Sequence, residues 1–299
     1  MKILVSGSSG LIGSALTPYF INKGHNVSKL IRKKLGKKDN EIYWEPQRNE
    51  VEASKLEGFD VVVHLSGENV FGLWTSKKKQ EIKDSRVKST TLLCDTLSKL
   101  ERKPRLLACA SAIGFYGDRG DEVLTEVSKA GTGFLAEVTK KWESATEVAT
   151  TKGIRVVNLR IGAVISSEGG ALQRMLLPFQ LGLGGRVGSG KQYISWISID
   201  DVCGSIHHAV VTDTINGPLN IVSPNPVTNL EFVKTLGRVL NRPTFFPIPS
   251  FILKSLFFEL AKEVLLTSTR VKPSKLLTSG YKFQYPVLEG TLRHILDRY

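Results

Sequence analysis

The glycine spacing near the N-terminus constrains the fold more than any other feature of this 299-residue chain. The segment KILVSGSSGLIGSAL places Gly7, Gly10 and Gly13 three residues apart, directly after the apolar run ILVS. In a strand–turn–helix unit, the first glycine begins the turn, the second lets the backbone approach a pyrophosphate, and the third lets the helix pack against the sheet. The free N–H groups at the start of that helix attract phosphate. We therefore expect a dinucleotide to bind at this turn.

Apolar runs of strand length alternate with segments of helical period along the first two thirds of the chain. Strand-like runs include KILVSG, DVVVHLSG, PRLLACASA and IRVVNLRIGAVIS, with helical stretches between them. Nearly continuous apolar strands that alternate with helices are typical of a parallel sheet covered on both faces. The sequence predicts an α/β fold, a Rossmann-like doubly wound parallel sheet in residues 1–223, with substrate-side loops from about residue 168. A smaller, mostly helical C-terminal lobe is predicted for residues 224–299.

The end of the second predicted strand indicates which dinucleotide binds. NAD sites usually place an acidic residue about 20 residues after the last glycine, where it bonds the ribose 2′-hydroxyl. Here that position reads LIRKK, with Arg32 about 19 residues after Gly13 and no acidic residue before Asp39. A guanidinium can bind a 2′-phosphate in a fork, whereas a carboxylate would repel it. The alternative is that Arg32 only begins a basic loop. We favour NADP over NAD.

Composition limits the partners of the chain. The net charge of +13 suggests an anionic partner, either nucleic acid or a small phosphate-bearing ligand on a basic surface. The second is favoured, because no helix-turn-helix, zinc-finger or aromatic RNA-binding signature is present. The chain has no run of 18 uncharged apolar residues, so we expect no membrane-spanning helix. Three scattered cysteines predict neither a disulfide framework nor a metal site and suit a reducing compartment, the cytoplasm or alternatively the nucleus.

Several longer segments resemble one known family. They are HLSGENV, MLLPFQLGLGGRVGSGKQYISWISIDD, GPLNIVSPNPVTNLEF and VKPSKLLTSGYKF. With the glycine turn, they are similar to the epimerase family proteins of the short-chain dehydrogenase/reductase superfamily, in its extended and atypical branch and including family 39U. The resemblance runs nearly end to end. It implies an NADP-dependent oxidoreductase or epimerase-like protein acting on an unknown small-molecule substrate, and it allows a homodimer through two helices that flank the sheet.

The resemblance also implies which residues contact the cofactor. They lie in the glycine turn, at the ends of the second strand and of the strand DVVVHLSG, on the helix that follows, and after Arg160-Ile161-Gly162. The implied set is Gly7, Ser9, Gly10, Leu11, Ile12, Gly13, Ile31, Arg32, Leu65, Ser66, Gly67, Glu81, Arg86 and Ala163.

The usual catalytic pair of this superfamily is missing. That chemistry needs Tyr-x-x-x-Lys on a helix and an upstream Ser, because the lysine lowers the pKa of the phenol that exchanges a proton with the substrate. Ser111 is at the position of the upstream Ser, but the helix FLAEVTKKWE has Leu135 and Thr139 at the tyrosine and lysine positions. Tyr116 is the nearest phenol, so Ser111 and Tyr116 are the candidate catalytic residues. The alternative is a catalytically silent NADP-binding regulatory or scaffold protein.

Overall fold

A parallel sheet forms the centre of the protein. The structure is a computed structural model and describes residues 1–32 and 38–297. Within these residues, eight strands form one sheet in the spatial order β12-β8-β6-β5-β1-β2-β3-β4. Later strands are added on one side of β1 as far as β4 and then on its other side, which is the strand order of a doubly wound fold. Every neighbouring pair is parallel except β3 and β4. The strands are β1 (Lys2–Ser6), β2 (Asn26–Ile31), β3 (Glu41–Glu45), β4 (Glu50–Val51), β5 (Val61–His64), β6 (Leu106–Ala112), β8 (Arg155–Ile161) and β12 (Gly217–Ile221).

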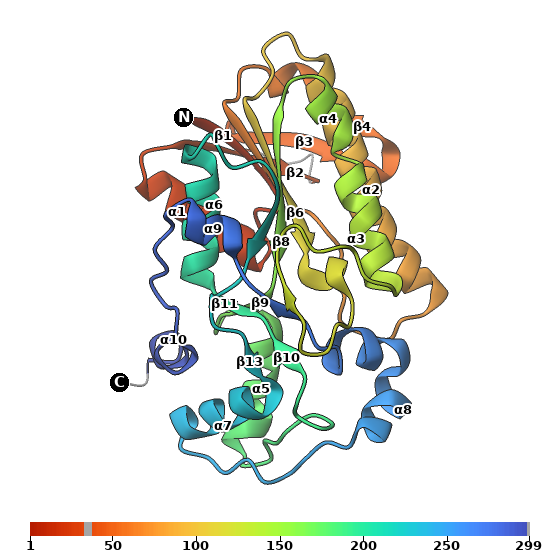
Figure 1. Ribbon diagram of the computed structural model, residues 1–299. Coiled ribbons are helices and arrows are strands. Elements are labelled where there is room, and N and C mark those ends of the chain that lie inside the picture. The colour runs from red at the N-terminus through yellow and green to blue at the C-terminus, as the bar shows by residue number, and fades with distance from the viewer. Residues whose placement is uncertain (33–37, 298–299) are drawn as a thin grey trace.

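Helices cover both faces of this sheet (Figure 1). On one face lie α1 (Leu11–Asn22) and α6 (Ile199–Val211), and on the other α2 (Ser76–Lys99), α3 (Phe134–Ser144) and α4 (Glu147–Thr151). The predicted fold class is confirmed.

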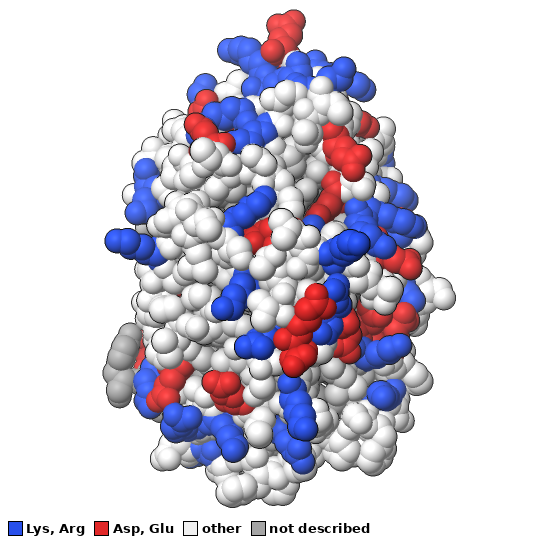
Figure 2. Space-filling view, viewed as in Figure 1, with Lys and Arg blue, Asp and Glu red and all other residues white. Residues whose placement is uncertain are grey.

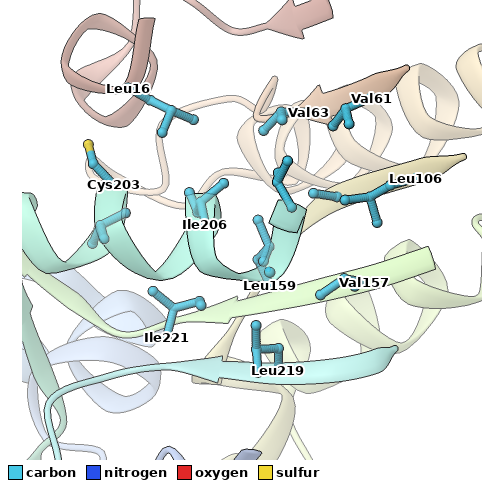
Figure 3. Packing of buried hydrophobic residues seen from close by; sticks show 14 of the residues in the cluster. Leu16, Val61, Val63, Leu106, Val157, Leu159, Cys203, Ile206, Leu219 and Ile221 are labelled. Carbon is cyan, nitrogen blue, oxygen red and sulfur yellow. The ribbon is translucent and has the colours of Figure 1, made fainter. Parts of the chain in front are cut away.

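The strands are apolar on both sides because each side packs on helices. Ile3 and Val5 of β1 face the α1–α6 layer, and Leu4 between them faces the α2 layer. Figure 3 shows the first layer, where Leu16 of α1 and Ile206 of α6 meet side chains from the strands. This packing holds the glycine turn at the end of β1 in a fixed position.

The smaller lobe lies beyond the carboxyl ends of the strands (Figure 1). Its core joins Leu172, Phe179 and Trp196 to residues of the C-terminal third, so the chain crosses between the two parts more than once. Its elements are β9 (Ala163–Ile165), α5 (Gly170–Gln180), β10 (Tyr193–Ile194), β11 (Trp196–Ser198), β13 (Val227–Thr228), α7 (Asn229–Leu240), α8 (Ser250–Leu260), a π-helical turn (Ala261–Leu265) and α10 (Leu288–Ile295). The division at residue 223 remains a prediction.

The remaining short elements connect these parts. They are the 3-10 turns Pro46–Arg48, Ala53–Leu56 and Ile113–Tyr116, the strands β7 (Val123–Leu124) and β14 (Arg270–Val271), and α9 (Ser274–Thr278). Among the described residues, no helix combines the length and the hydropathy that a membrane crossing needs. Cys94, Cys109 and Cys203 are buried free thiols.

Candidate functional site

Two of the three glycines are required by the backbone itself. Gly7 has φ +69°, and a Cβ there would lie 2.7 Å from the carbonyl carbon of Leu65. A Cβ on Gly13 would lie 2.2 Å from the carbonyl oxygen of Gly7. The turn between β1 and α1 therefore closes this tightly only with glycine at both positions.

Gly10 differs, because its backbone does not need glycine. Its φ is −79°, and a Cβ added there would have its nearest neighbouring atom 3.4 Å away. Gly10 is the N-cap of α1, and no side chain caps this helix, so the N–H groups of its first turn are left without a side-chain acceptor. Space above Gly10 and a free helix N-terminus are the two features that a pyrophosphate needs.

The neighbouring predicted residues line this turn. Ser9 is exposed, and Leu11 and Ile12 are partly buried. A Cβ on Gly169 would lie 3.2 Å from the side chain of Leu11, so the loop that enters α5 passes over the start of α1. The smaller lobe thus packs against the first residue of α1.

The ends of β2 and β5 flank the glycine turn, since both strands pair with β1. Ile31 ends β2, and Arg32 follows it with an exposed side chain. Leu65 and Ser66 continue from β5 and are partly buried, while Gly67 is exposed. The structure brings these predicted residues to one edge of the sheet; the basic residues at 33–34 fall outside the described residues.

Arg86 lies over Gly67. A Cβ on Gly67 would be 3.4 Å from the guanidinium carbon of Arg86. The guanidinium stacks on Trp142, 5.1 Å from the ring centroid, and Nη1 donates to the carbonyl of Ile82 at 3.0 Å. Burial lowers the pKa of Arg86 to about 10, although the nearby charge of Glu68 opposes this. Among the described residues it forms no ion pair within 4.0 Å, so this half-buried cation is suited to an anionic ligand.

Glu81 and Ala163 lie differently from Arg86. Glu81 is exposed on α2, where Lys77 Nζ lies 4.0 Å from its Oε1, so it does not share the half-buried position of Arg86. Ala163 begins β9, and its N–H donates to the carbonyl of Ser195 at 2.9 Å.

Tyr116 is fully buried, so its hydroxyl is not open to solvent. Its hydroxyl donates to Asn220 Oδ1 at 2.7 Å and accepts from Arg160 Nη1 at 3.0 Å. Burial raises the pKa of the phenol, although the Arg160 charge opposes this. Ser111 is also buried, and its Oγ donates to Glu143 Oε1 at 2.7 Å. Both predicted catalytic residues belong to one internal polar network, a geometry that favours a supporting role for each.

Leu135 and Thr139, at the positions of the missing Tyr–Lys pair, lie close to the residues that follow β6. Leu135 lies against the loop that follows β6, since a Cβ on Gly114 would be 3.3 Å from Leu135 Cβ. Thr139 is buried one turn later and donates to the carbonyl of Leu135 at 2.7 Å. A hydrocarbon and a short hydroxyl thus occupy the positions where the superfamily has its proton donor and its cation.

Comparison with known proteins agrees with this geometry. The family model described as "NAD dependent epimerase/dehydratase family" matches residues 3–221, more than half of the chain. The chain belongs to this family. A second model, for a domain of unknown function, matches residues 248–295.

Relatives of this epimerase/dehydratase family member match it over its whole length. A Mycobacterium bovis protein named "Epimerase family protein Mb2239" is 39% identical over 99% of this chain and 98% of its own. The crystal structure of human epimerase family protein SDR39U1 with NADPH matches with a TM-score of 0.92 and 33% identity, covering all of both chains. The structure named as a nucleoside-diphosphate sugar epimerase from Corynebacterium glutamicum matches with a TM-score of 0.83 and 35% identity, over 99% of this chain and 58% of that one.

Sequence reasoning missed three residues of the site. Glu143 and Arg160 form the internal ion pair that holds Ser111 and Tyr116, and Glu263 comes from the smaller lobe. Glu263 Oε2 accepts from the N–H of Leu135 at 3.2 Å, at the start of α3. A buried-strand arginine such as Arg160 is the one signal that the sequence offered, because a cation there requires a carboxylate partner.

Proposed function

We propose that this epimerase family protein is an NADP(H)-dependent oxidoreductase or epimerase-like enzyme acting on a small molecule. One observation carries the proposal: Gly7 and Gly13 are fixed by the backbone, whereas Gly10 is left open at an uncapped helix N-terminus. Such a turn fits a dinucleotide pyrophosphate. The NADPH in the structure of the human relative supports NADP over NAD.

The residues of this chain fit the parts of that cofactor. The α1 N-terminus and Gly10 would hold the pyrophosphate, and the exposed Arg32 would pair with a 2′-phosphate. Arg86 would place a second positive charge near the phosphates, and Ala163, at the start of β9, would lie on the nicotinamide side. NADP(H) bound here would supply or accept a hydride, and the residues of this chain would bind and orient it.

Gly10→Ala tests the proposed site directly. The added methyl group would occupy the space left for the pyrophosphate but meets nothing closer than 3.4 Å in the protein. We expect the NADPH dissociation constant to rise at least about tenfold, while thermal unfolding stays within a few degrees of wild type. Gly290→Ala is the matched control, since its Cβ would have no neighbour within 4 Å. Unchanged NADPH binding by Gly10→Ala would contradict the proposal.

A second candidate is an NADP-binding protein without turnover. Leu135 and Thr139 favour it, because neither can transfer a proton as a Tyr–Lys pair does, and Tyr116 is enclosed. A panel of nucleotide-sugar, ketone and quinone substrates distinguishes the two candidates. Oxidation of NADPH that depends on one of them supports the enzyme, and inert behaviour of all with saturating NADPH supports the silent protein.

Which molecules this protein binds besides the cofactor, and whether it forms a homodimer, remain predictions. On the face that Figure 2 shows, Lys and Arg are spread among acidic and uncharged residues, and this face therefore supports a small anionic ligand rather than nucleic acid. The large hydrophobic side chains found exposed in the described chain include none from α2 or α3. We infer that a homodimer through these two charged helices is disfavoured, which light scattering of the purified protein measures. The cytoplasmic or nuclear location also remains a prediction.

A further inference from the structure

Two segments of the smaller lobe run side by side. One is residues 180–187, from the last residue of α5 onward, and the other is residues 242–248, between α7 and α8. Three hydrogen bonds join them: from Arg242 Nε to the Gln180 carbonyl at 2.8 Å, from the Phe246 N–H to the Gly184 carbonyl at 3.4 Å, and from the Ile248 N–H to the Arg186 carbonyl at 2.8 Å. The two segments therefore form one surface.

This surface exposes large apolar side chains. Phe245 is 82% exposed, Leu181 65%, Phe246 57% and Leu183 55%, and Ile248 is exposed beside them. We call these five residues the apolar tip. Neighbouring exposed side chains of this kind usually mark a surface that binds something.

The apolar tip lies at the end of the molecule that is away from the sheet. In Figure 1, the chain between α7 and α8 forms the lowest part of the molecule, and Figure 2 shows this part in white and blue. A Cβ on Gly188 would lie 3.7 Å from Ser250 Cβ, so the start of α8 adjoins the two segments. Phe251 and Ile252 of α8 are exposed as well and extend the apolar surface.

The charges around the apolar tip are basic. Residues 169–199 contain three lysines or arginines and residues 232–258 contain four, and neither range contains an aspartate or glutamate. Of these seven cations, only Arg238 has a carboxylate partner among the described residues, namely Glu289. Glu231 and Glu259 border the second range, and Glu259 is paired with Lys79 at 2.8 Å. The tip therefore combines exposed hydrocarbon with cations that no carboxylate neutralises.

This combination favours one kind of occupant. A second copy that met the tip with its own tip would bring the same positive charges and be repelled. The cavities around Glu143 and around Arg270 include no residue of the tip, so neither offers a peptide helix a groove there. An anionic lipid surface provides both hydrocarbon and negative headgroups. Since no helix of the described residues could cross a membrane, the contact would be made at its surface.

We propose that the apolar tip docks this protein on the surface of a membrane that contains anionic phospholipids. Leu181, Phe245 and Phe246 enter the boundary between headgroups and acyl chains, and the exposed cations Arg186 and Lys254 face the lipid phosphates. This docking is separate from the cofactor site and does not depend on it.

Co-sedimentation of the purified chain with lipid vesicles tests the proposal. The vesicles consist of phosphatidylcholine alone or of phosphatidylcholine mixed with phosphatidylglycerol. We expect binding to the mixed vesicles to be stronger by at least about fivefold, the contribution of one cation near an anionic surface. A salt concentration of about 1 M, which screens charges beyond about 3 Å, should remove this preference. No binding to the mixed vesicles, or equal binding to both kinds, would overturn the proposal.

Two exposed positions give variants that keep the fold. Phe245→Ser should weaken binding to the mixed vesicles at least about tenfold, and Lys254→Glu at least about fivefold. The matched controls are Val127→Ser, a 90% exposed aliphatic position in the loop after β7, and Lys152→Glu, an exposed cation before β8. Both controls should bind as wild type does, and all four variants should unfold within a few degrees of wild type. Vesicle binding that Phe245→Ser leaves unchanged would contradict the role of the tip.

Light scattering without vesicles separates docking from self-association. We expect wild type and Phe245→Ser to have the same mass in solution. If wild type is a dimer that Phe245→Ser converts to a monomer, the tip joins two copies of the chain and the proposal fails.

Discussion

Arg160 and Glu143 form a two-pronged ion pair beneath the candidate site. Arg160 Nε donates to Glu143 Oε1 and Nη2 to Oε2, both at 2.8 Å. Burial opposes the charge of the guanidinium, but the hydrogen bonds and charge of Glu143 outweigh it and raise the pKa of Arg160. The same two side chains hold Ser111 and Tyr116. The end of β6 is therefore fixed by an internal charge network.

Neutralising one partner of this ion pair should lower the free energy of unfolding more than removing an exposed charge does. Glu143→Gln leaves the nearly buried Arg160 without a counter-charge, which typically costs about 3–5 kcal/mol. Urea unfolding measures the loss. Glu147→Gln, one turn later and exposed, is the control and should change the free energy of unfolding by less than about 0.5 kcal/mol. Equal effects of the two substitutions would refute the role given to the pair.

Tyr116→Phe should affect stability but not cofactor binding. The change removes a buried hydroxyl that bonds Asn220 and Arg160, at a cost of about 1–3 kcal/mol. The dissociation constant of NADPH should stay within about twofold of wild type. A loss of NADPH binding with unchanged stability would instead place the phenol in contact with the cofactor.

His64 gives the protein an acid-sensitive core. The imidazole is fully buried at the end of β5, with Nδ1 2.6 Å from Ser6 Oγ and Nε2 3.0 Å from Thr90 Oγ1. Burial lowers its pKa from 6.5 to about 3. Because the folded pKa is depressed, the unfolded chain takes up the proton first as the pH falls. The stability from neutral His64 is present above about pH 6.5 and is lost progressively toward pH 3.

Unfolding measured against pH tests this effect. Between pH 7.5 and pH 5, the His64 contribution should fall by about 2 kcal/mol. His64→Gln keeps hydrogen-bonding groups but cannot be protonated, so its stability should decline less steeply than that of wild type. The pKa values of His25 and His207 are also lowered, mainly by burial, and these residues add to the decline equally in both proteins. Parallel curves for the two proteins would contradict the assignment.

Local patterns were sufficient to predict the sheet and the glycine turn. The runs around 61–64 and 106–112 are apolar on both faces, and the spacing of Gly7, Gly10 and Gly13 depends only on neighbouring residues. The cofactor edge follows, because strands that pair in parallel end at the same edge.

The internal network could not be predicted in the same way. Tyr116 meets Asn220, which lies 104 residues away, so its burial depends on how β12 ends beside β8. The Glu263–Leu135 contact joins residues 128 positions apart. No local period encodes such contacts. The N-cap of α6 is Ser198, whose Oγ accepts from the N–H of Asp201 at 3.0 Å.

The central claim is that the glycine turn and Arg32 hold NADP(H). The most direct measurement is a titration with NADPH and NADH of wild type, Arg32→Glu and Lys152→Glu, an exposed charge reversal before β8. A charged hydrogen bond is worth about 1.5–3 kcal/mol, so Arg32→Glu should weaken NADPH binding about ten- to a hundredfold. NADH binding should not weaken, and Lys152→Glu should resemble wild type. Equal weakening of both cofactors, or no binding of either by wild type, would contradict the account.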